Sequence, residues 1–410
     1  MVVENNYISI LTKNLPKHWE SFRIGSVFVE RTEKVSDKDF APLSVTMKGV
    51  VPQLDSIAKT NNGDNRKKVC INDFVINSRS DRKGSGGMSK YEGSVSLINT
   101  VLKPNDKYEN RYTNYLFTNV LFQEEFYKFG KGIVDDMWST KYFDMKYIKV
   151  PCPPIEEQIA IANHLDSQSK KIKHFIKKKQ TFIELLKEQR QAVINKAFKP
   201  NKNDGWKDNR LKFFTKRIGD GLHGTPEYVN SSHYKFINGN NLRSGNIYID
   251  EETNSVSSEE YEKYDLKLVE GSILYSINGT IGNSAFYKGE KIVLGKSAAY
   301  IEPKDLGNEV DFDYLYHYLN TDMVMIYFLE ATASTTIKNL SLETLRNMPI
   351  SYPIDKQKQA QIVSHIKTET AKIDQAITKA QKEIELIKEY KEAMIAEAVL
   401  GKFNHKIVKS

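Results

Sequence analysis

A long helical pattern occurs twice in this chain, and the second copy repeats the first at a constant offset of 201 residues. His164 returns as His365 and Ile172 returns as Ile373, and most of the apolar positions that follow return in the same way. Such a repeat constrains the architecture, because each copy is one structural unit that buries its apolar face against a neighbour. We therefore expect two long helices, each following a domain of its own.

The apolar residues of each helix step alternately by four and three, with no Pro or Gly in 167–199 or 367–400. This is the a/d spacing of a coiled coil, whose seam packs against a partner helix. Two matching seams in one chain can satisfy each other; a generic helical hairpin or a homodimerising coil is the alternative. Lys179 and Arg190 occupy seam positions, where polar residues cost stability and favour one register and partner. The apolar seam residues are Ile172, Ile176, Ile183, Leu186 and Val193 in the first helix and Ile373, Ile377, Ile384, Ile387 and Met394 in the second.

The length of these helices suggests a spacing role. A helix of roughly 30 residues spans about 45 Å. One turn of B-DNA is roughly 34–36 Å long. The pair is therefore long enough to hold two domains about one DNA turn apart, although length alone is no evidence for DNA.

The two domains that precede the helices, called head one and head two below, open and close in the same way. Between the shared marks their sequences diverge. Each head has roughly 150 residues, the size of one domain with its own core. The shared marks are Trp19-x3-Arg23 and Trp206-x3-Arg210 at the starts, and Pro153-x4-Gln158 and Pro353-x5-Gln359 at the ends.

Both heads contain short strand-like runs and helical segments, which predicts mixed α/β (α+β) domains. The whole chain is then a repeat of head and helix. We expect head one at 1–154, a helical spacer at 155–200, head two at 201–355 and a second helical spacer at 356–410. The strand-like runs are Val69–Asn77, Ser94–Leu102, Gly271–Ile277 and Lys296–Ile301, and the helical segments are Tyr112–Lys128 and Asp311–Leu329.

The charge of the chain favours an acidic partner. Its net charge is +8 and its isoelectric point is about 9.0. The excess lies mainly on the first helix, where 168–200 carries about 10 basic and 2 acidic residues, while 367–403 is balanced. These lysines could lie near phosphates. A solvated helix face or a surface for an acidic protein is the other interpretation.

No pattern typical of catalysis or metal binding is found. Two cysteines, Cys70 and Cys152, allow no disulfide framework. HExxH, CxxC, GxxxxGK and GxGxxG are all absent. We therefore expect no catalytic residue, metal site or bound cofactor in this chain. No apolar run approaches 18 residues and the N-terminus lacks a signal-peptide pattern, which predicts a cytoplasmic protein.

The order head, coil, head, coil resembles the specificity subunit of type I restriction–modification enzymes. PPIEEQ at 153–158 is similar to the family's PPLxEQ signature, and YPIDKQKQ at 352–359 is a weaker second copy without the EQ pair. Between them the heads resemble two different target-recognition types. The segments that carry this likeness are 42–53, 65–69 and 73–87 in head one and 220–228 and 236–242 in head two.

This resemblance implies a concrete function. Such subunits bind an asymmetric, bipartite double-stranded DNA site through two target-recognition domains separated by antiparallel coils with a pseudo-twofold axis. Two methyltransferase subunits dock on the scaffold and use S-adenosylmethionine to methylate adenine N6. Two restriction–translocase subunits add ATP- and Mg²⁺-dependent translocation and cleavage. The chain itself would determine which DNA sequence is bound and would carry out no chemical step.

Three polar, Gly-containing loops are the candidate DNA contacts, because base edges are read by Arg, Lys, Asn and Gln forks. They are 77–87 in head one, and 219–228 and 278–283 in head two. A solvated loop, or glycines that serve backbone geometry alone, is the alternative. The candidate base readers are Asn77, Arg79, Ser80, Arg82, Lys83, His223, Thr225, Tyr228, Asn278 and Thr280, and the candidate phosphate contacts are Lys67, Lys68, Lys216 and Arg217.

Two other functions are compatible with the sequence. One is a two-headed adaptor that binds proteins rather than DNA, with the Lys-rich helix as its docking surface. The other is a fused enzyme whose catalytic motif has no familiar spacing. A salt-dependent shift of DNA that requires an added methyltransferase would favour the specificity subunit over both.

Overall fold

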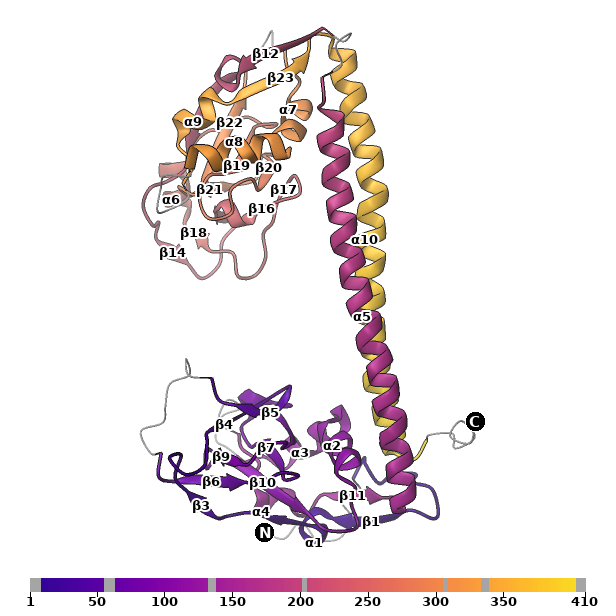
Figure 1. Cartoon of the computed structure of the whole chain (residues 1–410). Helices are drawn as coiled ribbons and strands as arrows, with labels where there is room; N and C mark the ends of the chain where they lie inside the picture. Colours follow the sequence, from indigo (N-terminus) through magenta and orange to yellow (C-terminus); the bar gives the residue numbers. More distant parts are fainter. Residues whose placement is uncertain are drawn as a thin grey trace. The chain divides into compact units, whose positions relative to one another are not determined.

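The computed structural model describes residues 9–54, 63–131, 138–200, 205–304, 309–332 and 339–402. The chain divides into two compact units, which are described one at a time (Figure 1). Unit 1 consists of residues 1–179 and 381–410 and contains head one. Unit 2 consists of residues 180–380 and contains head two. Each of the two long helices contributes to both units.

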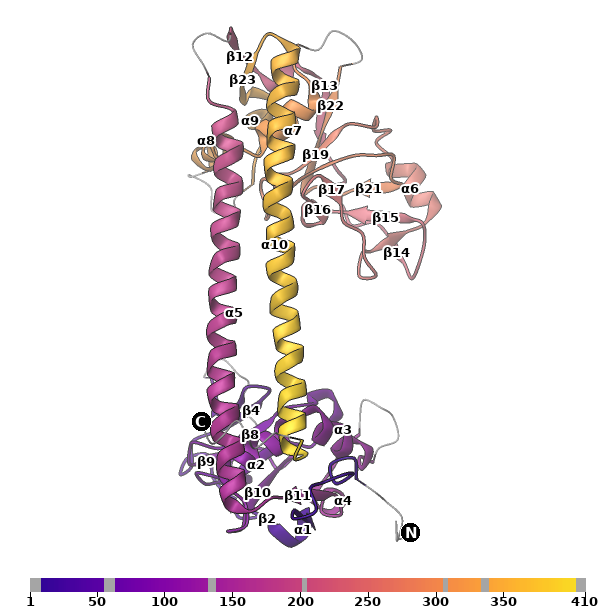
Figure 2. The same cartoon turned by 90° about the vertical axis from the view of Figure 1, so that its right-hand side faces the viewer.

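The long helices are α5 (Ile155–Ala197) and α10 (Lys356–Val399), which lie side by side in both views (Figures 1 and 2). In unit 1, Leu165 near the start of α5 shares a core with Val399 at the end of α10. In unit 2, Ile194 near the end of α5 shares a core with Val363 near the start of α10. The two helices are therefore antiparallel within each unit.

The burial of the two helices follows the predicted seam. Every seam position from Ile172 to Ala197 and from Ile373 to Ala398 is buried or half-buried, while most positions between 173 and 189 are exposed. Fully burying one such aliphatic side chain contributes roughly 1.5–3 kcal/mol. The seam therefore stabilises each unit through contacts between the two helices.

The two heads share one sheet topology, although their sequences differ. Each has a four-stranded antiparallel sheet, ordered β2-β10-β7-β8 in head one and β13-β22-β19-β20 in head two. The second strands of the two sheets, β10 and β22, both have six residues and both end in Pro. The bounds are β2 Phe28–Glu30, β7 Phe74–Asn77, β8 Gly86–Met88 and β10 Asn99–Pro104, and β13 Thr215–Asp220, β19 Ile273–Ser276, β20 Ser284–Phe286 and β22 Ala298–Pro303.

The last three helices of each head follow the last strand of its four-stranded sheet in the same order, whereas the first helix of each head has no α-helical counterpart in the other head. Their apolar faces complete two separate cores, one for each head. Phe198, next to the end of α5, packs edge-on against Tyr314 and Tyr318 in head two. The helices are α1 Ile24–Val27, α2 Asn110–Thr118, α3 Val120–Lys128 and α4 Tyr142–Met145 in head one, and α6 Ser258–Tyr264, α7 Phe312–Leu319, α8 Asp322–Thr332 and α9 Leu342–Asn347 in head two.

The shared opening and closing motifs form a joint between each head and its helix. β1 (Glu20–Arg23) pairs with β11 (Lys149–Cys152), and β12 (Trp206–Arg210) pairs with β23 (Pro349–Pro353), both antiparallel. Gln158 and Gln359 are fully buried beside these pairs. Each Gln makes three hydrogen bonds of 2.8 Å: Gln158 with Lys107 O, Pro153 O and Glu109 N, and Gln359 with Glu309 O, Pro353 O and Asp311 N.

The smaller sheets differ between the heads. Head one has β3-β6-β9 and β4-β5, whereas head two has β14-β18-β15-β21 and β16-β17. The divergence in sequence therefore falls on these sheets and on loops. Their bounds are β3 Lys34–Val35, β4 Leu43–Thr46, β5 Gly49–Pro52, β6 Arg66–Val69 and β9 Gly93–Val95, and β14 Tyr228–Val229, β15 Tyr234–Ile237, β16 Leu242–Arg243, β17 Asn246–Ile247, β18 Ser255–Val256 and β21 Ile292–Leu294.

Several predicted elements are wrong in extent. The helix expected at Tyr112–Lys128 is two helices, because Asn119 is extended and its side chain caps α3 by accepting from Phe122 N at 3.0 Å. The helix expected at Asp311–Leu329 is likewise divided between α7 and α8. The run Val69–Asn77 contains a turn between β6 and β7, with Asn72 at φ 68°. Asn adopts this left-handed conformation more readily than most residues.

None of the helices among the described residues is long and apolar enough to span a membrane.

Candidate nucleic-acid interface

The predicted loop of head one connects β7 to β8 and contains a short 3-10 turn at Ser80–Arg82. The first residues of the loop are held by a local hydrogen bond, in which Asn77 Oδ1 accepts from Arg79 N at 3.1 Å. Gly84 has φ 79°, a conformation that glycine adopts without strain. The turn leaves Arg79, Arg82 and Lys83 exposed.

Aromatic side chains lie beside these cations. Lys83 Nζ is 5.6 Å from the centroid of the Tyr127 ring, and the Tyr127 hydroxyl donates to Arg79 O at 3.4 Å. Ser80 N donates to Trp138 O at 2.9 Å. Arg82 Nε lies 3.6 Å from Asp81 Oδ2, and this ion pair joins two exposed side chains and is worth little. The surface combines exposed cations with an aromatic ring, as nucleic-acid-binding surfaces often do.

A cleft of about 760 Å³ opens next to this loop within unit 1. Arg79 and Lys67, both predicted contacts, lie in its wall together with Lys141, Tyr142 and Phe143, which sequence reasoning missed. The signal that could have found them is the run WSTKYFDMKYIK at 138–149, which interleaves aromatic residues with lysines.

The predicted phosphate contacts of head one already have acidic partners. Lys67 Nζ contacts Glu30 Oε1 at 2.8 Å and Asn99 O at 2.9 Å. Lys68 Nζ contacts Glu33 Oε1 at 2.9 Å, and this hydrogen bond raises the pKa of Lys68. A phosphate would have to replace these carboxylates, so both contacts stay predictions.

In head two, His223 and Thr225 of the loop after β13 and Tyr228, the first residue of β14, are exposed at the surface. His223 Nε2 lies 2.8 Å from Asp220 Oδ2. The loop needs Gly221, because a Cβ there would lie 2.1 Å from Leu294 O. The backbone just before His223 is therefore held against β21, and Leu222 N donates to Leu294 O at 2.7 Å.

The second loop of head two, 278–283, connects β19 to β20. It is topologically equivalent to the β7–β8 loop of head one. The equivalence extends to an isolated bridge, since Arg79 pairs with Ser139 in head one and Asn278 pairs with Asn339 in head two. Thr280 Oγ1 lies 3.1 Å from Ser276 Oγ, inside the turn. The structure thus brings Arg79 and Asn278 to corresponding positions of two different heads, which their sequences did not indicate.

Arg217, predicted to contact phosphate, belongs to an internal network. It is paired with Glu302, which is buried, and its Nη2 donates to Leu266 O at 3.0 Å and Lys267 O at 3.2 Å. Its neighbour Lys216 is exposed. Arg217 therefore stabilises the fold of head two, whether or not it also contacts DNA.

Shifted pKa values occur both beside the first loop, where burial raises the pKa of Tyr127 to about 12, and away from these loops. Desolvation raises the pKa of the Cys152 thiol and of the Glu125 carboxyl. Desolvation also lowers the pKa of His317 to about 4. In the part of the chain that the structure describes, no group of three or more His, Cys, Asp or Glu side chains is placed to hold a metal ion. The exposed polar and cationic side chains of these loops suit the binding of a ligand.

Comparison with known proteins finds relatives of one kind. The model of the type I restriction modification DNA specificity domain matches residues 197–386. A curated relative from Methanocaldococcus jannaschii, described as the specificity subunit of type I restriction enzyme MjaX, is 25% identical over 406 residues. The match covers 92% of this chain and 87% of the relative. The chain is therefore similar to the specificity subunits of type I restriction–modification systems, in 197–386 to the family model and along most of its length to the curated relative.

Solved structures are similar to this chain at the level of the fold. A chain from a study of complex assembly and conformational transition of the type I R-M system has a TM-score of 0.69 at 15% identity, covering 95% of this chain and all of that chain. The HsdS subunit from Thermoanaerobacter tengcongensis has a TM-score of 0.51 at 16% identity, covering 96% of this chain and all of that chain. Specificity subunits form a generally non-catalytic family.

Proposed function

We propose that this chain binds an asymmetric, bipartite DNA site, with one half-site read by each head and a spacer of any sequence between them. The observation that carries the proposal is the pairing of one shared sheet topology with two different loops at the same hairpin. Two equal loops would suit a palindromic site. The loop at 77–87 offers cations, whereas the loop at 278–283 offers an amide and a hydroxyl, so the half-sites differ.

The loop chemistry fits base reading in the major groove. Arg pairs through two hydrogen bonds with guanine O6 and N7, and Asn pairs with adenine N6 and N7. On this basis Arg79 or Arg82 would read a G·C pair, and Asn278 would read an A·T pair. Lys216 and the exposed lysines of α5 would contact phosphates, which fix the register but carry no sequence information.

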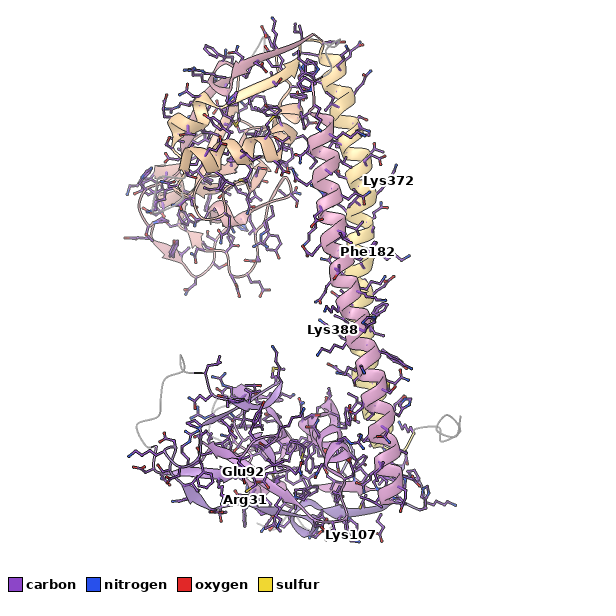
Figure 3. The ribbon with its side chains drawn as sticks, in the orientation of Figure 1. Arg31, Glu92, Lys107, Phe182, Lys372 and Lys388 are labelled. Atoms are coloured by element: carbon purple, nitrogen blue, oxygen red, sulfur yellow. The ribbon has the colours of Figure 1, made fainter. Side chains whose placement is uncertain are left out.

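The methyltransferase subunits would dock on the coil. Leu185 of α5 and Leu386 of α10 are repeat equivalents, and both are exposed, by 56% and 51%. Each has an exposed aromatic residue within about one turn, Phe182 for the first and Tyr390 for the second (Phe182 is labelled in Figure 3). An apolar residue repeated at the surface of both helices suits two copies of one partner.

The chemistry would reside on those partners. S-adenosylmethionine would bind the two methyltransferase subunits, and ATP and Mg²⁺ would bind two restriction–translocase subunits, so that this chain holds no cofactor. The proposal predicts that DNA binding depends on the assembled complex. It also predicts that affinity falls steeply with salt, since each phosphate contact releases counterions.

The proposal can be tested with hairpin variants in the presence of the methyltransferase. Replacing Arg79, Arg82 and Lys83 with Ala should weaken binding of the methylated site by about tenfold or more, since each bidentate contact is worth about 1–3 kcal/mol. Lys149→Ala, an exposed lysine of head one away from the hairpin, should leave binding within about twofold. Equal losses for both variants, or for neither, would refute base reading by this hairpin.

The docking surface has its own test. Leu185→Glu combined with Leu386→Glu should abolish co-purification with the methyltransferase without lowering the melting temperature of the chain, because both side chains are exposed. Lys187→Glu combined with Lys388→Glu is the matched control at neighbouring repeat positions. Full assembly of the leucine variant would remove the support for docking at these residues.

A further inference from the structure

Two ion pairs link α5 to α10, one in each unit. In unit 1, Lys179 Nζ lies 2.5 Å from Glu383 Oε2. In unit 2, Arg190 Nε lies 3.0 Å from Asp374 Oδ1. Interhelical ion pairs at the edge of a coiled-coil seam govern which helix pairs with which.

The internal repeat gives each ion pair an equivalent position in the other unit. The offset of 201 residues relates Arg190 to Lys391 and Asp374 to Lys173, so the equivalent of this ion pair joins two lysines. The other pair, Lys179 with Glu383, corresponds to Ala380 with Phe182. The apolar seam is thus duplicated but neither ion pair is. The apolar residues would allow either helix to take either place in the pair, and only the charges differ between the two places.

We propose that these charges select the pairing of α5 with α10 and disfavour the pairing of α5 with the α5 of a second copy of this chain. An antiparallel pair of two α5 helices in the same register would place Arg190 against Lys173 of the other copy at both ends. It would also place Lys179 against Phe182, where it meets no carboxylate. The basic excess of 168–200 adds repulsion along the whole length.

The charges disfavour pairing between two copies of α5, but they do not disfavour pairing between two copies of α10. An antiparallel pair of two α10 helices would place Asp374 against Lys391 at both ends, an attractive contact. The same region of α10 carries balanced charge. The unequal distribution of charge between the two helices, which DNA binding does not explain by itself, is therefore accounted for by their different pairing partners.

The order of synthesis explains why α5 needs this protection. Residues 198–355 separate α5 from α10. At about 5–20 residues per second, the seam of α5 waits roughly 10–30 s for its partner. During that time the nascent chains on neighbouring ribosomes present identical apolar seams. Repulsion between copies of α5 keeps the seam available for α10.

The test exchanges charges within the full chain, so that the intramolecular ion pair is kept. Arg190→Asp with Asp374→Arg retains an ion pair between α5 and α10, but it converts both contacts of a hypothetical α5 pair from repulsive to attractive. Lys179→Glu with Glu383→Lys is the matched control, because it retains its ion pair and creates no attractive contact between copies of α5. Two differently tagged copies of each full chain are co-expressed, and the mixed complexes are counted after purification on one tag.

The expected result is a rise of about tenfold or more in mixed complexes for the 190/374 exchange, since each exposed charge contact changes association roughly two- to fivefold. The wild type and the 179/383 exchange should both give few. Equal melting temperatures verify that the intramolecular pairing is intact. If the 190/374 exchange does not fold, Arg190→Glu with Asp374→Lys repeats the test. Mixed complexes that are equally abundant, or equally rare, in both exchanges would overturn the proposal.

Discussion

Trp206 provides the sharpest test of how the two halves of the chain differ. In unit 1, Glu157 accepts hydrogen bonds from Trp19 Nε1 and His18 Nε2, both at 2.8 Å. In unit 2, Trp206 Nε1 is buried and has no hydrogen-bond partner. The repeat places Lys358 at the position of Glu157, one residue before the buried glutamine. We predict that Lys358→Glu supplies the missing acceptor.

The gain can be estimated from the groups involved. A buried donor without a partner costs about 1–3 kcal/mol, and a hydrogen bond to a charged acceptor contributes about 1.5–3 kcal/mol. The corresponding Glu157 side chain is 23% exposed, so solvent screening reduces the gain. We expect unit 2 to be stabilised by about 1–2 kcal/mol. At about 2–4 °C per kcal/mol for a unit of this size, its melting temperature should rise by roughly 2–8 °C.

The assay is thermal or urea unfolding of the full chain, followed by tryptophan fluorescence. Lys358→Met is the control, because it removes the lysine without supplying an acceptor. Trp206→Phe completes a double-mutant cycle, in which the benefit of Lys358→Glu should vanish when the indole is absent. A gain that persists with Trp206→Phe, or that Lys358→Met reproduces, would refute the assignment of Lys358 to the Glu157 position.

Three further predictions concern the cores of the heads. Gln359→Met should destabilise unit 2 by roughly 2–4 kcal/mol in urea unfolding, because three buried backbone groups lose their partner. An unchanged unfolding midpoint would contradict the stabilising role of Gln359 between head two and its helix. Arg217→Met should cost roughly 2–4 kcal/mol by leaving the buried Glu302 uncompensated, whereas Lys216→Met should change stability little. Burial lowers the pKa of His317 from its ordinary value of about 6.5 to about 4. The contribution of the neutral imidazole to folding stability is therefore fully present above pH 6.5 and is lost as the pH falls towards 4. His317→Asn should remove up to about 3 kcal/mol of that pH dependence, and parallel stability–pH curves for the two proteins would show that His317 does not titrate this way.

The repetitive parts of the chain could be predicted from the sequence. The heptad spacing identified the seam because burial along a coiled coil follows a period that local sequence records directly. The shared Trp and Gln marks lie at or near the starts of β1, β12, α5 and α10. Their atomic role was not visible, because the partners of Gln158 and Gln359 are backbone atoms some 50 residues earlier, in 107–109 and 309–311.

The common topology of the heads could not be predicted from the sequence. Strands such as β7 and β19 keep their burial but not their residues, since hydrophobic side chains of similar size substitute for each other in a sheet. The breaks at Asn119 and Asn320 were missed, because the apolar pattern continues across them. The equivalence of Arg79 and Asn278 depends on strand order, which two divergent loops do not reveal.

The central claim is that each head addresses one half of a bipartite DNA site. It is tested most directly by adenine-methylation sequencing of a host genome after residues 206–350 have been replaced by the corresponding head of a type I specificity subunit. The account predicts that one half of the methylated motif changes while the other half and the spacer stay as they were. A change in both halves, or an unchanged motif from an assembled and active complex, would contradict it.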